Sequence, residues 1–261
     1  MITVVGRPKT ILARLYGSNN KSYLRKTAGW ITAADLDLLP FYRSVDVTLK
    51  PLIRHLRGLK PPRTATAHEA LIIAFTEQQI TTRLARTFQN RMVLKYGKPF
   101  QLGELKFHTF PSPHSLASAS KEDLKHLGLS RNKADFIVEA SRSVASGELD
   151  LEALKGRPTT EAREVLLSIK GVGEWTADYV LSRGLGRPEM VPYYDLGARD
   201  TIGLFTLAGG GRSLRRLRRS SPALGPMRAS PTGTSSTPAS WGRAWRRSLR
   251  CTPNHKQPVE H

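Results

Sequence analysis

The stretch "LLSIKGVGEWTADYVLSRGLGRPEMVPYYDLG", residues 166–197, holds two glycines, two aromatic residues and a lone carboxylate in a fixed order. Its pattern predicts a helix, a tight turn at residues 170–173, a second helix, and then a short loop that reaches Asp195. Glycine at positions 171 and 173 permits positive φ and lets another backbone approach closely. The stretch contains a Gly-x-Gly, but no Lys-Ser/Thr follows it and no clear strand precedes it.

Each feature of this stretch has a structural and a functional interpretation. If the second helix begins near Gly173, its free N–H groups form a site for a backbone phosphate, to which Lys170 adds a positive charge. A plain helical hairpin with a glycine cap fits the same residues. Trp175 and Tyr179 lie four apart on one face, which suits either core packing or base stacking. Asp195 precedes an apolar residue, as a helix N-cap does, and it can also face a pocket.

Composition indicates a polyanionic partner. The chain of 261 residues has 41 Lys and Arg against 21 Asp and Glu, a formal net charge of +20. Its pI near 10.6 favours nucleic acid over a membrane, with a merely basic tail as the alternative. The single cysteine, Cys251, excludes an intrachain disulfide, an iron–sulfur cluster and a cysteine-based zinc site. We therefore expect no cofactor and no metal apart from the monovalent cation considered below.

The chain lacks targeting signals that a sequence can reveal. No apolar run approaches the roughly 20 residues of a membrane span, and the N-terminus has no signal-peptide pattern. We expect a cytoplasmic, nucleoid-associated protein with no membrane partner.

Three segments are expected: a small N-terminal segment at residues 1–60, a core at 61–205 and a tail at 206–261. In the first segment, "ITVV" resembles a short strand, and residues 34–59 resemble two short amphipathic helices. From residue 67 to 205 the pattern is helical throughout, which predicts an all-α fold of non-parallel helices. The expected helices cover residues 68–97, two short pieces between Ser112 and Gly128, 131–147, 160–171, and a last one from Gly173.

The tail has an unusual composition. Residues 206–261 hold eleven Lys and Arg and one acid, Glu260, among Ser, Pro, Thr and Gly. This pattern fits a disordered, basic DNA-binding tail, and it equally fits GC-rich codons translated out of frame. In either case we expect no native helices after about residue 206. Apolar surface of the core would then stay exposed, so we expect low stability and weakened or absent activity.

Several motifs occur together in one order and carry a family resemblance. They are "AFTEQQIT" (74–81), "FPSPHSLASASKEDLKHLGLSRNKADFI" (110–137), "GELDLEAL" (147–154), "IKGVGEWTADYVL" (169–181) and "VPYYDLG" (191–197). Over roughly residues 35–205 the chain resembles the helix-hairpin-helix (HhH-GPD) DNA glycosylase superfamily, and within it 3-methyladenine DNA glycosylase II. The resemblance implies an all-α, two-lobed glycosylase core, flanked here by the small N-terminal segment and an irregular C-terminal tail.

The resemblance also implies site residues. Asp195 is the expected catalytic carboxylate, and Trp175 and Tyr179 are expected to line the base pocket. In the family the hairpin amides hold a phosphate, and the hairpin carbonyls often hold a monovalent cation. Tyr194 stands where the family often has the first of two acids, and Asp195 matches the second. The residues expected to lie against DNA are Lys170, Gly171, Val172 and Gly173 of the hairpin, and Gln78 and Gln79 of a glutamine-rich turn.

The implied activity is excision of alkylated purines from double-stranded DNA by a monomer that flips the damaged nucleotide out of the duplex. Lyase-competent relatives carry Lys at the position of Trp175, so a monofunctional enzyme is expected here. Two alternatives remain: a non-catalytic helix-hairpin-helix DNA-binding protein, and a glycosylase for uracil or hypoxanthine.

Overall fold

The computed structural model describes residues 2–7, 10–15, 20–45, 47, 50–190 and 195. The predictions for the tail at 206–261 lie outside these residues, and the three-segment division with a boundary at residue 60 stays a prediction. The chain divides into two compact units, one that includes residues up to Leu24 and one that begins at Arg25.

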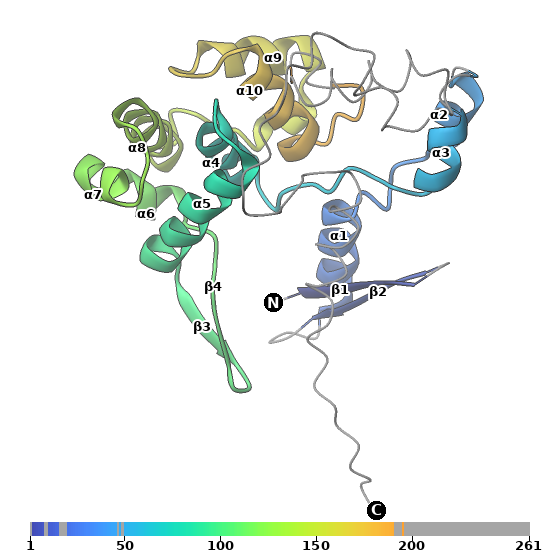
Figure 1. Cartoon of the computed structure of the whole chain (residues 1–261), viewed down its shortest axis with the longest axis horizontal. Helices are drawn as coiled ribbons and strands as arrows, with labels where there is room; N and C mark the ends of the chain where they lie inside the picture. Colours follow the sequence, from blue (N-terminus) through green and yellow to red (C-terminus); the bar gives the residue numbers. More distant parts are fainter. Residues whose placement is uncertain are drawn as a thin grey trace, which may run out of the picture. The chain divides into compact units, whose positions relative to one another are not determined.

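The first unit contains an antiparallel hairpin of β1 (Ile2–Arg7) and β2 (Thr10–Leu15), with Ile2 opposite Leu15. The strand predicted at "ITVV" is confirmed, whereas the sequence analysis did not anticipate its partner. Beyond this hairpin, the described residues are predominantly helical (Figure 1), which confirms the all-α class.

The helices are short and follow one another closely. None within the described ranges is long and apolar enough to cross a bilayer. They are α1 (Lys21–Ile31), α2 (Leu39–Ser44), α3 (Lys50–Leu56), α4 (Ala67–Glu77), α5 (Thr82–Tyr96), α6 (Pro113–Ala117), α7 (Lys121–His126), α8 (Arg131–Ala145), the 3₁₀ turn η2 (Ala153–Gly156), α9 (Thr159–Ser168), α10 (Glu174–Tyr179) and the π turn η3 (Val180–Gly184).

The predicted helix at residues 68–97 is wrong, because α4 and α5 are separate helices. The chain turns at Gln78 and Gln79, and Gln79 adopts a positive φ of 54°. Thr81 then starts α5, because its side chain accepts a hydrogen bond from the amide of Leu84. A hydroxyl that caps a new helix competes with continuation of the old one, so the apolar period alone was misleading.

Residues 99–108 contradict the expectation of helix throughout. They form a second antiparallel hairpin of β3 (Pro99–Leu102) and β4 (Leu105–His108), which extends away from the helices in Figure 1. Gly103 closes its turn with φ 60°. Phe100 and Phe107 face each other across the strands, with ring centroids 5.5 Å apart. Alternating apolar residues around a glycine were the signal that the sequence analysis missed.

Helix α4 is the centre of the second unit. Leu71, Ile72 and Phe75 are fully buried, together with the alanines on its other faces, as expected for a helix covered on all sides. Figure 1 shows α4 among α5, α8 and α10, and each of these contacts it. At Gly184 the turn η3 crosses α4 so closely that an added Cβ would lie 2.8 Å from Cβ of Ala70. A small residue is therefore required at this crossing.

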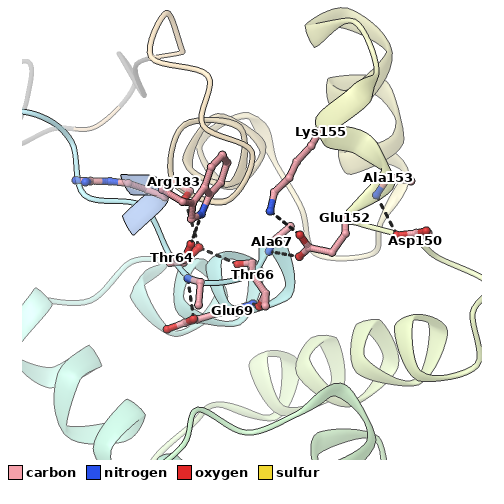
Figure 2. Close-up of polar contacts among 11 residues, drawn as sticks. Thr64, Thr66, Ala67, Glu69, Asp150, Glu152, Ala153, Lys155 and Arg183 are labelled. Carbon is pink, nitrogen blue, oxygen red and sulfur yellow. Dashed lines mark hydrogen bonds and ion pairs between the residues drawn. The ribbon is translucent and has the colours of Figure 1, made fainter. Parts of the chain in front are cut away.

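The start of α4 is held by a network of acceptors (Figure 2). The Thr66 side chain accepts from the amide of Glu69 at 3.0 Å, and the Glu69 carboxylate accepts from the amide of Ala65 at 3.1 Å. Glu152, from the distant η2 region, accepts from the amide of Ala67 at 2.6 Å and pairs with Lys155. Thr66 and Glu152 thereby satisfy N–H groups that a helix leaves unpaired at its first turn, and Glu69 ties the preceding residue Ala65 to that turn.

The segment before α4 is fastened to the end of the α10–η3 helix. The amide of Thr64 donates to the Arg183 carbonyl at 3.0 Å, and the Arg183 guanidinium donates to the Pro62 carbonyl at 2.8 Å. The indole of Trp30 donates to the Thr64 carbonyl at 2.8 Å, and the Arg63 guanidinium lies 4.5 Å from the Trp30 ring centroid. The α10–η3 helix, which carries Trp175 and Tyr179, is thus held at its end by Pro62 and Thr64. Trp30 of α1 in turn holds Thr64.

A buried histidine of α4 makes the fold sensitive to acid. His68 is 4% exposed, and its Nε2 lies 3.0 Å from Oγ of Ser141. Burial lowers the pKa of His68 from 6.5 to about 4. The unfolded state therefore binds this proton more tightly than the folded state between these pH values.

Acidification from pH 7 to pH 4 is expected to lower the free energy of unfolding by roughly 3 kcal/mol through His68 alone. Urea denaturation of His68→Asn should show a correspondingly shallower loss of stability over this range than the wild type. The exposed His126 provides the control, because His126→Asn should retain the wild-type slope. Equal slopes for wild type and His68→Asn would contradict the assignment.

Candidate functional site

The turn between α9 and α10 is shaped by its first glycine. Gly171 has φ 84°, and the amide of Val172 donates to the Ile169 carbonyl at 3.0 Å. A Cβ on Gly171 would lie 2.3 Å from the ring of Phe136 on α8. Gly171 is therefore needed for both the backbone angle and the close approach, and the predicted helix–turn–helix is confirmed.

The second glycine plays a different part. Gly173 has extended backbone, with φ −101° and ψ −178°, and a Cβ there would meet nothing within 4 Å. Helix α10 begins after it without a hydrogen bond from a side-chain cap. Between the glycines, Val172 is 8% exposed and belongs to the core. The hairpin thus has a buried anchor at Val172 and an open approach to the first amides of α10.

Lys170 extends from this hairpin and is already paired. Its Nζ lies 3.0 Å from Oε2 of Glu139 on α8, and its side chain is 66% exposed. Exposed pairs contribute little to stability, so an incoming phosphate can compete with the Glu139 carboxylate.

Trp175 and Tyr179 share a face of α10, as their spacing predicts. Their ring centroids are 5.4 Å apart, the ring planes are inclined by 32°, and both residues are half-buried. Burial, and then the nearby Glu77 carboxylate, raise the pKa of the Tyr179 phenol above its ordinary value. Tyr179 therefore stays neutral at physiological pH, and the pair forms a partly accessible aromatic surface.

Asp195 lies at the edge of this aromatic pair. The indole Nε1 of Trp175 donates to Oδ2 of Asp195 at 3.1 Å, across a separation of 20 residues in sequence. Asp195 is half-buried. This hydrogen bond joins the two kinds of residue that the sequence analysis selected, a carboxylate and an aromatic ring. The alternative that Asp195 caps a helix concerns residues outside the described ranges.

The sequence analysis missed Glu77 as a member of the site. Burial raises the pKa of the Glu77 carboxyl, and Asp195 adds to this effect, while Gln89, Arg86 and Arg183 oppose it. Asp195 thus has a second carboxylate in its electrostatic neighbourhood. No local signal marked Glu77, because only the packing of α4 against α10 brings it near.

The two glutamines of the α4–α5 turn point to different environments. Gln78 Nε2 donates to the Gly171 carbonyl at 3.0 Å and to Oγ1 of Thr176 at 2.9 Å. Gln79 is exposed. The two glutamines therefore differ in how they fit the predicted DNA contact. Gln79 is accessible for such a contact, whereas the Gln78 amide group is bound to the hairpin and to α10.

The expected monovalent cation remains a prediction. Of the hairpin carbonyls, that of Ile169 accepts from the amide of Val172, and that of Gly171 accepts from Gln78. A carbonyl oxygen has two lone pairs, so both still fit a second, cationic partner. Among the described residues, no three His, Cys, Asp or Glu side chains are grouped so as to hold a metal ion.

A glycine hairpin next to two aromatic rings and a carboxylate, in a helical fold, defines the helix-hairpin-helix class. Residues 72–220 match the family described as "HhH-GPD superfamily base excision DNA repair protein". The chain belongs to this superfamily. The match ends within the segment 206–261 that the sequence analysis assigned to the tail.

Individual 3-methyladenine DNA glycosylases are also similar to this chain in sequence or in structure. The chain is 33% identical to the DNA-3-methyladenine glycosylase of Bacillus subtilis over 170 residues, which cover 64% of this chain and 56% of that protein. It is 28% identical to DNA-3-methyladenine glycosylase 2 of Escherichia coli over 128 residues, 49% and 44% of the two chains. The solved 3-methyladenine DNA glycosylase of Archaeoglobus fulgidus superposes with a TM-score of 0.68 at 28% identity, over 84% and 76% of the chains. The chain thus spans about half the length of these two curated relatives.

The hairpin geometry predicts unequal effects of alanine at the two glycines. Gly171→Ala should lower the free energy of unfolding by about 2–4 kcal/mol, because positive φ and the clash with Phe136 both oppose a Cβ. Gly173→Ala should cost less than about 1 kcal/mol, since its backbone is extended and its surroundings are open. Urea denaturation of both variants measures the difference. Similar costs at the two positions would contradict this account of the turn.

Proposed function

We propose that this protein is a DNA glycosylase that excises alkylated purines of the 3-methyladenine type from double-stranded DNA. The observation that carries the proposal is the Trp175–Asp195 hydrogen bond beside Tyr179. It unites a stacking surface and a carboxylate next to the hairpin of a base-excision repair family. The names of the relatives support the substrate class.

The aromatic pair suits a cationic base. Alkylation of a purine at N3 or N7 leaves the base positively charged, weakly paired and a good leaving group. Such a base costs less to flip out of the duplex than an intact one. The faces of Trp175 and Tyr179 attract a cation through the negative potential above the rings. Because the phenol of Tyr179 stays neutral, it keeps its hydrogen-bond donor while it stacks.

Asp195 serves the sugar side of the reaction. As the N-glycosidic bond breaks, positive charge develops on C1′ and the ring oxygen, much as in glycoside hydrolysis. The carboxylate of Asp195 stabilises this charge or orients the attacking water. The Trp175 indole donates to Oδ2 of Asp195 and so holds the carboxylate beside the aromatic pair. One residue of the stacking surface therefore also fixes the orientation of the carboxylate.

The hairpin binds the DNA backbone. The first amides of α10 are approachable past Gly173, and the positive end of a helix attracts a phosphate. Lys170 joins the contact by exchanging Glu139 for the phosphate. Such binding is independent of sequence and depends on salt, which fits a net charge of +20 on a monomer that searches long stretches of DNA.

The enzyme is proposed to be monofunctional. Trp175 takes the place of the lysine that forms a Schiff base in lyase-competent relatives. The two described lysines that contact the hairpin or the neighbouring turn are engaged elsewhere. Lys133 donates to the Thr76 and Gln78 carbonyls, and Lys170 pairs with Glu139.

The decisive experiment compares base release from methylated duplex DNA by the wild type and Asp195→Asn. The variant should lose about 10²–10⁴-fold in single-turnover rate and bind duplex DNA as the wild type does. Asp150→Asn is the matched control, since this exposed carboxylate accepts from the amide of Ala153 far from α10 in sequence.

The outcomes separate the candidate functions. Wild type and Asp195→Asn that both bind DNA but release no base would favour the non-catalytic DNA-binding protein. Release of uracil or hypoxanthine in preference to methylated purines, measured on a panel of duplexes with single lesions, would replace the proposed substrate class.

Borohydride trapping tests whether the protein, which has Trp175 in place of the lysine of lyase-competent relatives, forms an imine with abasic DNA. Incubation with abasic DNA and borohydride should give no covalent protein–DNA adduct, because Trp175 stands at the position of the lysine that forms the imine in lyase-competent relatives. A Trp175→Lys variant provides the positive comparison, since it restores the nucleophile at the matching position. A strong adduct with the wild type would overturn the monofunctional assignment.

A further inference from the structure

The end of α4 is fastened by a lysine from another helix. Lys133, in the first turn of α8, donates from Nζ to the carbonyls of Thr76 at 3.0 Å and Gln78 at 2.7 Å. These are carbonyls that the end of α4 leaves without helical partners, and a cation there also complements the helix dipole. Burial lowers the pKa of Lys133, in agreement with its sheltered position. Lys133 thus fixes the backbone on which Gln78 stands.

The Gln78 side chain reaches from this fixed backbone into the hairpin. Both of its Nε2 bonds end on the α9–α10 region: one on the Gly171 carbonyl at 3.0 Å, the other on Oγ1 of Thr176 at 2.9 Å. Only an amide or a cation can donate twice from one nitrogen. Thr176 is 2% exposed, so the second bond is shielded from water. Loss of such a bond leaves a buried hydroxyl unsatisfied.

The two acceptors of the Gln78 amide lie in the hairpin turn and in the first turn of α10. Gly171 sets the hairpin turn, and Thr176 follows Trp175 directly in the first turn of α10. A single side chain therefore fixes both the position of the turn and the rotation of α10 about its axis. That rotation decides where the Trp175 indole points, and the indole holds Asp195.

We propose that Gln78 is a positioning residue for the reaction: it sets the Trp175–Asp195 pair by holding Gly171 and Thr176, and Lys133 holds Gln78 in turn. This role rests on the proposed glycosylase function for its kinetic measurement. Both bonds of the Gln78 amide nitrogen end on protein atoms, so its role is to position the site rather than to contact the base or the sugar. Its effect belongs in the rate of base release more than in DNA affinity, because duplex binding is spread over the many basic residues of a chain with a net charge of +20.

The test uses two near-isosteric variants, Gln78→Leu and Thr176→Val, and their combination. Each single variant should lower the single-turnover rate of 3-methyladenine release about tenfold, the loss expected for one shielded hydrogen bond, with duplex affinity within about twofold of wild type. The double variant should be no slower than about the slower single variant, because both changes remove the same contact. Thr176→Ser retains the hydroxyl and should restore most of the rate.

Gln101→Leu is the matched control. Gln101 also donates from Nε2 to a backbone carbonyl, that of Gly103 at 3.0 Å, but it does so on the exposed β3–β4 hairpin. This variant should retain the wild-type rate, and its effect combined with Gln78→Leu should be additive. Wild-type rates for Gln78→Leu, or multiplying losses in the Gln78→Leu/Thr176→Val variant, would overturn the proposal.

Amide hydrogen exchange gives a measurement that does not depend on activity. In Gln78→Leu, protection should fall selectively at residues 171–179 while the remaining helices keep theirs. Unchanged protection at 171–179 would refute the positioning role even if the wild type proved inactive. Conversely, selective loss of protection in a protein that releases no base would leave the link to the hairpin standing and refute the glycosylase function alone. Thr176→Val repeats the measurement with the smaller change, should Gln78→Leu fail to fold.

Discussion

The contact of Gly171 with the Phe136 ring is the constraint on which the site depends. The hairpin can reach α8 this closely only because Gly171 has no side chain. The closeness has consequences on both sides of the turn. It places Lys170 within an ion pair of Glu139, and it places the Gly171 carbonyl within a hydrogen bond of Gln78. Helix α10 then starts at a fixed point, with Trp175 and Tyr179 half-buried on one of its faces.

Helix α4 converts this local constraint into a stable scaffold. Its start is capped from within by Thr66 and from a distance by Glu152, and its end is capped by Lys133. A helix capped at both ends by side chains from other elements cannot shift along its axis without breaking hydrogen bonds. The candidate site lies at the C-terminal end of α4, so the packing of α4 in the core determines where Glu77 and Gln78 lie.

The sequence predicted what is local and missed what depends on distant contacts. The boundaries at Ser112, Gly128 and Gly147 follow from caps and positive φ, and these depend on adjacent residues. The shared face of Trp175 and Tyr179 follows from helical spacing in the same way. The break after α4 and the β3–β4 hairpin were missed because the prediction rested on the spacing of apolar residues alone. It did not consider Thr81 as a helix cap or Gly103 as a turn residue.

The links of the site span 93 residues from Gln78 to Gly171 and 98 to Thr176, and no local pattern encodes them. They are nevertheless strongly determined in the folded protein. A buried donor or acceptor left without its partner costs about 1–3 kcal/mol, which is a large share of the stability of a domain. A rotation of α10 that moved the Trp175 indole off Asp195 would also separate Thr176 from Gln78. The geometry of the candidate site and the stability of the helices around it are therefore maintained by the same hydrogen bonds.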